Sequence, residues 1–325
     1  MSSPAGCFKY GCIGCLSITA LGFGLILFLS TLQFFASTDP EPVERLAEQV
    51  LPTPPTSPEP PTIDPDQPDA VEFAPVPELS PDQGVGTLIL DMAMGDFTIQ
   101  PGPPDQPVRI EADFDASKFE LKEDWTQGLN GNWTYKVSFD AKGGFFGLLF
   151  GGGGNVNNNI TVTVPRGHPM RIAGSIKMGE SKTDLGGLWL ESFNVDYGMG
   201  DHFVEIREPL VAPMDDFTVV GSMGELEIRN LGNGSPREVD VEQGMGELFL
   251  DLKGPWRNDA EIKAQFSMGG CRVWVPEDVR IDVTGGAVSM GESRINLPDV
   301  AELPDDAPRL DLVLGGSMGE VTVEY

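Results

Sequence analysis

Apolar and polar residues alternate with a period of two along much of the segment from residue 84 to residue 325. Runs such as Leu226–Ile228 and Val321–Val323 follow a Met-Gly pair, and runs such as Phe217–Val220 precede one. This alternation is typical of half-buried β-strands, and no long stretch of this segment has a helical period. The pattern predicts an all-β region in which each unit is a strand, a Met-Gly bend, a second strand and a turn.

The bends recur at a nearly fixed spacing. The sequence contains eight Met-Gly pairs, and an acid follows the glycine in seven of them, whereas Gly270 takes that place in the eighth. Between Met178 and Met290 the successive copies are 21, 24, 22, 23 and 22 residues apart. Such a period is typical of stacked structural units, so we expect a β-solenoid of two-strand repeats with a period of about 22 residues. The glycines that define the repeats are Gly95, Gly179, Gly200, Gly224, Gly246, Gly269, Gly291 and Gly319.

The parity of a strand predicts where the side chains at each bend point. Gly224 shares a face with the apolar residues that follow it, and Met223 and Glu225 share the opposite face; a bulge at the glycine would instead turn the methionine inward. Stacked acids would lie about 4.8 Å apart and repel one another by roughly 0.8 kcal/mol in water. We expect them at an exposed rim, and raised pKa values or a bridging Ca²⁺ are the alternatives. The methionines could line a track for the soft ion Cu(I), or pack in the core or on the sheet face.

Residues 16–37 have the properties of a transmembrane helix. Leu16 to Ala36 are 21 residues without a charge, which is enough to cross roughly 30 Å of hydrocarbon. Lys9 is the one charge before them, and this favours a short cytoplasmic N-terminus at residues 1–15 with the rest of the chain outside. A cleaved signal peptide is the alternative, but no clean Ala-x-Ala precedes Ser37. We expect an anchor in a bacterial inner membrane and a periplasmic or extracellular C-terminal domain.

The next segment, residues 38–83, is an acidic linker that holds 13 prolines. It cannot bury a core and should be extended and semi-rigid, with a reach on the order of 100 Å. The linker would hold the domain of residues 84–325 away from the membrane. That domain is long enough for one hydrophobic core, and its repeats are interrupted by an atypical insertion at residues 115–158.

Within the insertion, a glycine-flanked run has the composition of an exposed apolar tip. Its apolar residues are Phe145, Phe146, Leu148, Leu149 and Phe150. One hypothesis is that this tip contacts a partner or a membrane, and the other is a hairpin that caps the end of the stack. Trp125 and Trp133 are predicted to pack the insertion down.

Charge and composition narrow the possible chemistry. The formal net charge of −29 disfavours nucleic acid and anionic lipid surfaces as partners. Two histidines leave little material for metal sites or catalytic triads. Cys271 is predicted to be a small core residue. Cys7, Cys12 and Cys15 fit acylation or a membrane edge better than an iron–sulfur centre, so we expect no cofactor and no metal site.

Two patterns that resemble catalytic sites have simpler explanations. Gly315–Gly319 matches Gly-x-Ser-x-Gly, but the nucleophile elbow needs a helix after the serine and a strand is predicted there. Ser222, Ser267 and Ser289 occupy the same repeat position, so the motif is a product of the repeat. Some β-solenoids cleave polysaccharides with clustered acids, but the candidate aspartates have no specific spacing. They are Asp196, Asp201, Asp215 and Asp216.

Residues 159–325 resemble a known group of bacterial domains. The resemblance rests on the recurring Gly-acid steps and on three segments, Ile160–Pro165, Asp184–Leu188 and Val273–Val279. This part of the chain is similar to toastrack, or adhesin-like, β-solenoid domains, which include the C-terminal domain of LiaF-type cell-wall-active antibiotic response proteins. The resemblance implies a fold without shared catalytic residues, tethering to the bacterial envelope, and a role in stress sensing or protein contacts.

These observations predict a non-enzymatic, membrane-anchored extracytoplasmic interaction protein. It would be a scaffold or accessory subunit of a membrane complex, or an envelope-stress component, with a protein partner in the envelope. A surface adhesin or glycan-binding module is the alternative, and a carbohydrate-active enzyme is the third possibility.

Overall fold

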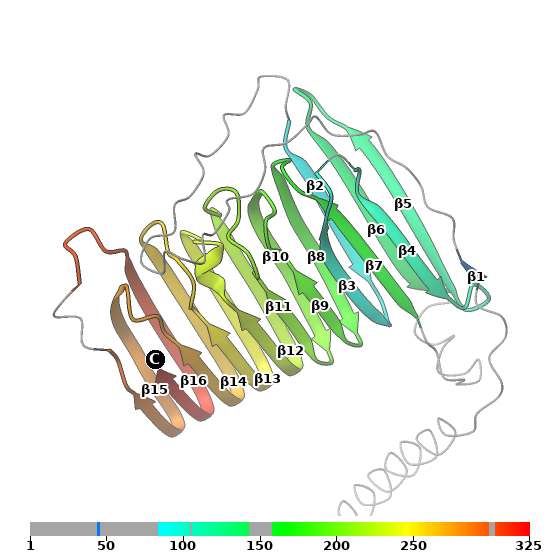
Figure 1. Ribbon diagram of the computed structural model, residues 1–325. Coiled ribbons are helices and arrows are strands. Elements are labelled where there is room, and N and C mark those ends of the chain that lie inside the picture. The colour runs from blue at the N-terminus through cyan, green and yellow to red at the C-terminus, as the bar shows by residue number, and fades with distance from the viewer. Residues whose placement is uncertain (1–43, 46–83, 105, 143–157, 299–302) are drawn as a thin grey trace, which may run out of the picture.

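The computed structural model describes residues 44–45, 84–104, 106–142, 158–298 and 303–325 (Figure 1). The predicted membrane segment, residues 16–37, and all of the linker except residues 44–45 lie outside this part of the chain. Within it, no helix has the length and apolarity needed to cross a membrane.

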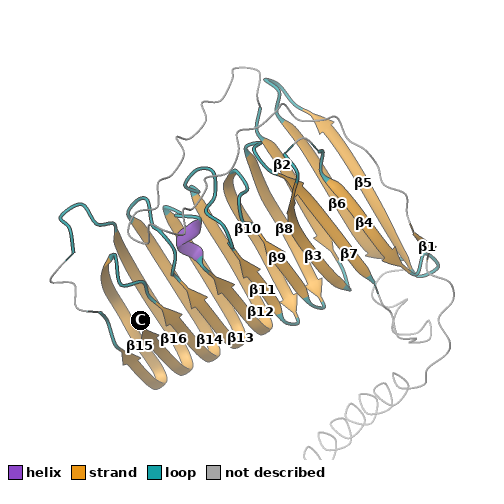
Figure 2. Ribbon diagram, in the orientation of Figure 1, coloured by secondary structure: helices purple, strands orange, loops and turns teal. Residues whose placement is uncertain are grey.

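The described residues form an all-β structure, which confirms that part of the prediction (Figure 2). A short 3-10 helix, η1 (Leu231–Asn233), follows β12. The strands are β1 (Glu44–Arg45), β2 (Gly86–Met92), β3 (Asp96–Gly102), β4 (Arg109–Phe114), β5 (Phe119–Gln127), β6 (Trp133–Ala141), β7 (Asn159–Pro165), β8 (Met170–Met178), β9 (Ser181–Asp184), β10 (Leu190–Met199), β11 (His202–Glu205), β12 (Asp216–Arg229), β13 (Glu238–Asp251), β14 (Ala260–Trp274), β15 (Arg280–Ile295) and β16 (Arg309–Glu324).

The repeating unit is a strand that bends once and so has two arms. In β12, residues 216–221 form a first arm that pairs with β10, and residues 226–229 form a second arm that pairs with β11. Met223 and Gly224 lie at the bend between the arms. In the earlier repeats the two arms are separate strands, such as β8 and β9. We call each two-armed strand, or pair of strands, a rung.

Most rungs stack in parallel and in register (Figure 1). The first arms follow the order β2, β8, β10, β12, β13 and β14. The second arms follow the order β3, β9, β11 and then β12 onward. Because Met199, Met223, Met245 and Met268 are successive partners in this register, the period of the sequence becomes columns of equivalent side chains.

At both ends of the stack the order in space differs from the order in the chain. β16 lies between β14 and β15 and runs parallel to both. At the other end, β6 and β7 lie outside β2 and β3, and β5 and β4 pair with them antiparallel. Two strands of the segment 115–158, β5 and β6, are therefore part of the sheet, and Trp125 stacks on Trp133 with ring centroids 4.9 Å apart.

The core consists of the inward side chains of both arms, which form one continuous hydrophobic cluster. One inward column of the second arms contains Leu226, Leu248, Cys271 and Val321, and none of these side chains is more than 3% exposed. The alternation that predicts the strands therefore also predicts the core, and Cys271 is the small core residue that the sequence indicates.

Each bend requires its glycine. All eight repeat-defining glycines have φ between +119° and +154°, a region that residues with a side chain rarely adopt. Neighbouring bends are also very close, because a Cβ added to Gly246 would lie 1.9 Å from the carbonyl oxygen of Gly224. The glycine thus permits both the turn of the chain and the contact between adjacent backbones.

Candidate functional site: the methionine ridge and the adjoining cleft

The bends display a column of exposed methionines, which we call the methionine ridge. Six of the eight bend methionines are between 38% and 62% exposed, so at these bends the methionine points outward, which settles there the direction that the sequence leaves open. At the first two bends Met94 and Met178 are less exposed, and Met94 packs against the core. The ridge contains, in order along the stack, Met199, Met223, Met245, Met268, Met318 and Met290.

A column of acids runs beside the ridge. All seven acids that follow a Met-Gly pair are exposed, as predicted for a rim: Asp96, Glu180, Asp201, Glu225, Glu247, Glu292 and Glu320. At the gap in this column, a Cβ on Gly270 would lie 2.3 Å from Oε2 of Glu247, so the Glu247 carboxylate extends over the missing side chain. Among the described residues, no cluster of three or more His, Cys, Asp or Glu side chains could hold a metal ion.

The acids differ in how they are neutralised. Arg294 forms salt bridges with both Glu292 (3.1 Å) and Glu320 (3.4 Å). In the part of the chain that the structure describes, Glu225 and Glu247 have no such partner. The middle of the ridge is therefore more negative than the end near β15.

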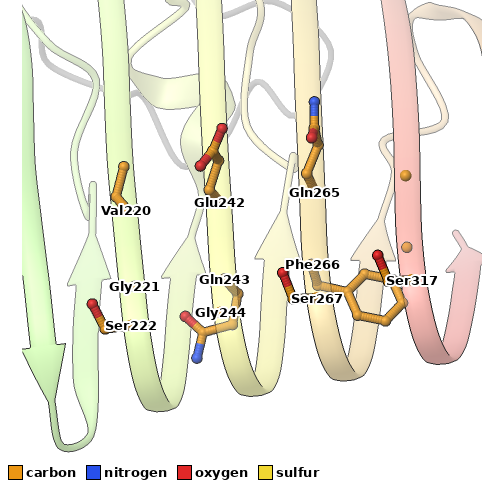
Figure 3. A pocket seen from close by; sticks show the side chains of 12 residues that line it. Val220, Gly221, Ser222, Glu242, Gln243, Gly244, Gln265, Phe266, Ser267 and Ser317 are labelled. Atoms are coloured by element: carbon orange, nitrogen blue, oxygen red, sulfur yellow. The ribbon is translucent and has the colours of Figure 1, made fainter.

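A cleft of about 490 Å³ adjoins the ridge, at the ends of the first arms of β12, β13, β14 and β16 (Figure 3). Its exposed side chains are polar and include Glu242, Gln265 and Ser267. Ser222 and Ser317 occupy the position of Ser267 in other rungs and also line the cleft. The arrangement offers hydroxyl, carboxamide and carboxylate groups at regular spacing across four strands.

Two large inward residues between two glycines shape the floor of the cleft. Gly221, Gln243, Phe266 and Gly316 are aligned in adjacent strands. A Cβ on Gly316 would lie 2.3 Å from Cζ of Phe266, and one on Gly221 would lie 1.9 Å from Oε1 of Gln243. Each large side chain therefore fills the space above a neighbouring glycine. Nε2 of Gln243 also donates hydrogen bonds to the carbonyl oxygens of Gly224 (2.9 Å) and Met245 (3.1 Å), which fix the carboxamide.

Both histidines are buried and engaged in structural contacts. Nε1 of Trp133 donates a hydrogen bond to Nε2 of His168 (3.1 Å), and Nδ1 of His202 is hydrogen-bonded to Oγ of Ser181 (2.9 Å). Burial lowers the pKa of His168, and it lowers the pKa of His202 to about 4. Both imidazoles are therefore neutral at pH 7, and neither hydrogen bond involves a residue of the cleft.

Within the described residues, the other groups that resemble catalytic residues do not come together in one site. Ser317 of the Gly-x-Ser-x-Gly motif lies within β16, so a strand follows it and the nucleophile elbow is not formed. Asp216 is aligned with Ser192, four residues before Asp196 on β10, and Asp215 faces Arg237 at 3.8 Å. Burial raises the pKa of Cys271 to about 12.

Two sets of residues from the sequence-based predictions lie outside the described residues: the apolar tip, Phe145, Phe146, Leu148, Leu149 and Phe150, and the cysteines Cys7, Cys12 and Cys15.

The cleft is the feature that the sequence does not predict. The signal that points to it is the glycine at positions 221 and 316, where neighbouring repeats have Gln243 and Phe266.

Comparisons with known proteins identify distant structural neighbours. No family model matches the chain, and no curated protein matches it. A "putative cell adhesion protein" from Clostridium sporogenes is 10% identical, with a TM-score of 0.38 over 87% of this chain and 99% of that one. A "putative adhesin" from Parabacteroides distasonis is 10% identical, with a TM-score of 0.32 over 72% of this chain and 91% of that one. A "putative adhesin" from Parabacteroides merdae is 14% identical, with a TM-score of 0.31 over 73% of this chain and 92% of that one. Similarity at this level does not assign the chain to a family.

Proposed function

We propose that this chain is a non-enzymatic extracytoplasmic interaction protein built on a toastrack-type β-solenoid. In this proposal, residues 16–37 anchor it in a bacterial inner membrane and residues 38–83 project the domain outward. The domain binds a protein partner, either as a scaffold or accessory subunit of a membrane complex or as an envelope-stress component. The cleft beside the methionine ridge is the surface that makes the contact.

The shape of the cleft is the observation that carries this proposal. It crosses four strands, and strands in a sheet are about 4.8 Å apart, so it spans roughly 14 Å. An extended peptide advances about 3.3 Å per residue, so this length accommodates about four residues. The volume of about 490 Å³ is also within the usual range for binding sites. The cleft therefore fits a short extended segment of a partner.

The charge of the cleft selects a basic segment. Glu242 lines it, and no lysine or arginine is among the described residues that do so. Glu225 and Glu247, which have no salt-bridge partner among the described residues, lie just beyond the adjoining bends. A lysine or arginine of the partner would gain a charge-assisted hydrogen bond with Glu242, and the net charge of −29 would attract it from a distance.

The proposal is tested with the full chain carrying a C-terminal tag. Native membranes are extracted in mild detergent, and mass spectrometry identifies proteins that co-purify in stoichiometric amounts. Two charge reversals on β13 are then compared. Glu242→Lys changes the cleft, and Glu238→Lys is the matched control because it is exposed on the same strand but does not line the cleft.

The two variants have opposite expected results. Glu242→Lys should lose the partner, while Glu238→Lys should retain it. Equal retention by both would show that the cleft is not the contact surface. A chain that co-purifies with nothing would refute the interaction proposal itself.

A surface adhesin or glycan-binding module is the second candidate, and the polar lining of the cleft favours it. Hydroxyls of Ser222, Ser267 and Ser317 and the amide of Gln265 can hydrogen-bond to sugar hydroxyls. Phe266 argues against it, because this aromatic residue of the cleft is only 4% exposed and cannot stack on a sugar ring. Binding to a polysaccharide array that Ser267→Trp abolishes would favour the glycan over the peptide.

A further inference from the structure

We propose that the methionine ridge binds soft monovalent metal ions, Cu(I) above all, between neighbouring rungs. This proposal is independent of the partner-binding function, because it concerns the thioethers of the bends and not the cleft. It requires no redox step, since the ion binds and leaves as Cu(I).

The constancy of the methionine within this chain is the first argument. Equivalent positions in the stacked rungs vary in the inward column, which contains Leu226, Leu248, Cys271 and Val321. They also vary in the next outward column, which contains Glu227, Phe249, Arg272 and Thr322. The residue before the bend glycine is methionine in every copy. Any apolar residue would serve if only an apolar surface were needed, so the constant feature is the thioether.

Exposure removes the usual explanation for the six methionines of the ridge. Methionine commonly fills irregular gaps in a core, as Met94 does at the first bend, but the ridge methionines are 38% to 62% exposed. The glycine that follows each of them has a backbone reason for its constancy, since its φ is positive. None of the methionines has a positive φ, so the backbone does not dictate their identity.

The geometry of the ridge suits a two-coordinate soft ion. Neighbouring methionines are register partners, so their backbones are about 4.8 Å apart. If the metal–sulfur bonds are as long as a zinc–thiolate bond, about 2.3 Å, two of them on opposite sides of an ion require a similar separation, about 4.6 Å. The three rotatable bonds of methionine allow the sulfurs to adjust, and thioethers favour Cu(I) over harder ions.

The middle of the ridge should bind most tightly. Glu225 and Glu247 follow Met223 and Met245 by two residues, and neither has a salt-bridge partner in the described part of the chain. Their charge would help to neutralise a bound cation. Glu292 and Glu320 are already paired with Arg294, so the site at Met318 and Met290 should be weaker.

The test is a competition for Cu(I) against the chelator bicinchoninate, under anaerobic and reducing conditions. The full chain is used with Cys7, Cys12 and Cys15 replaced by serine, because thiolates near the N-terminus would also take Cu(I). In this background we compare the parent with Met223→Leu/Met245→Leu/Met268→Leu, which keeps apolar side chains of similar size but removes three sulfurs. Calorimetric titration with Ag(I), which does not oxidise in air, provides a second measurement.

The parent should withdraw Cu(I) from the chelator. The triple variant should bind at least about tenfold more weakly, because loss of a residue that only supports a metal ligand already costs about 10–100-fold. Met214→Leu is the matched control, since it removes a sulfur from the core and should change nothing. If the triple variant fails to fold by circular dichroism, the single variant Met245→Leu still provides the comparison and should bind more weakly than the parent. No withdrawal by the parent, or equal binding by parent and ridge variants, overturns the proposal.

Discussion

Replacing one bend glycine by alanine should destabilise the whole stack. Gly319 in β16 has φ +135°, and a Cβ at this position would lie 1.6 Å from the carbonyl oxygen of Gly269. Gly315 in the same strand is the matched control, because its Cβ would meet nothing closer than Cγ of Gln265 at 3.7 Å and its φ is ordinary. Gly319→Ala and Gly315→Ala thus add the same methyl group in two different backbone environments.

The structure gives the size of the expected difference. A side chain in the positive-φ region costs about 1–3 kcal/mol. Relief of the contact requires the carbonyl and the methyl group to separate by well over an ångström between hydrogen-bonded strands, and overpacking of this kind costs a further 1–3 kcal/mol or so. Gly319→Ala should therefore lose about 2–6 kcal/mol. Gly315→Ala should be neutral or gain up to about 1 kcal/mol, because alanine restricts the unfolded chain.

Urea unfolding followed by circular dichroism measures both effects. With a slope of roughly 3 kcal/mol per molar urea, Gly319→Ala should lower the midpoint by about 0.7–2 M, and Gly315→Ala should leave it nearly unchanged. If the two variants had the same midpoint, the close backbone approach at the bends would not be a requirement of this fold. A large loss in Gly315→Ala alone would refute the assignment of strain to the bend.

Three further predictions concern buried groups. Phe266→Ala empties the space above Gly316 and should lower the free energy of unfolding by about 3–5 kcal/mol, measured by urea unfolding, unless the cleft collapses onto it. Because burial lowers the pKa of His202 to about 4 and the unfolded imidazole titrates near about 6.5, the unfolded state takes up the proton first as the pH falls. The free energy of unfolding should therefore decrease by on the order of 3 kcal/mol as the pH falls from about 6.5 to 4. The variant His202→Gln should lack this decrease. If the variant showed the same dependence of unfolding free energy on pH as the parent, the assignment to His202 would be wrong. Burial raises the pKa of Cys271 to about 12, so this thiol should resist iodoacetamide at pH 8 in the native protein and react in urea. Mass spectrometry of the peptide that contains Cys271 measures the labelling. Rapid labelling of the native protein would contradict the burial.

The local structure of the repeats could be predicted from the sequence because it depends on near neighbours. Parity along the chain fixes which residues of each arm face the core, and the spacing of Met-Gly pairs fixes which residues align. The acids at an exposed rim follow from the repulsion between stacked charges. The direction of the methionines did not follow, because it depends on the φ angle of each bend glycine, which parity alone does not determine.

The order of the rungs at the two ends could not be predicted, because it depends on pairings between distant segments. Parallel strands with the same Met-Gly pattern align equally well in either order. The one signal in the sequence is length, since Met290 and Met318 are 28 residues apart, which leaves additional chain for a longer connection. The cleft was missed for the same reason. Phe266 faces Gly316 only because β16 lies beside β14, and with β15 in that place it would face Val288.

The position of β16 between β14 and β15 has a consequence for how the protein folds as it is synthesised. A chain that emerges N-terminal end first completes β15 before β16, so β15 can occupy the open edge of β14 with its methionine and glycine aligned. The two pairings differ at Phe266. In a premature pairing of β14 with β15, Phe266 would face Val288, whereas in the final pairing of β14 with β16 it faces Gly316. A β15 strand paired there would have to leave that edge before β16 could insert. The glycine at position 316 thus helps to determine the order of strands, because it leaves room for the ring of Phe266.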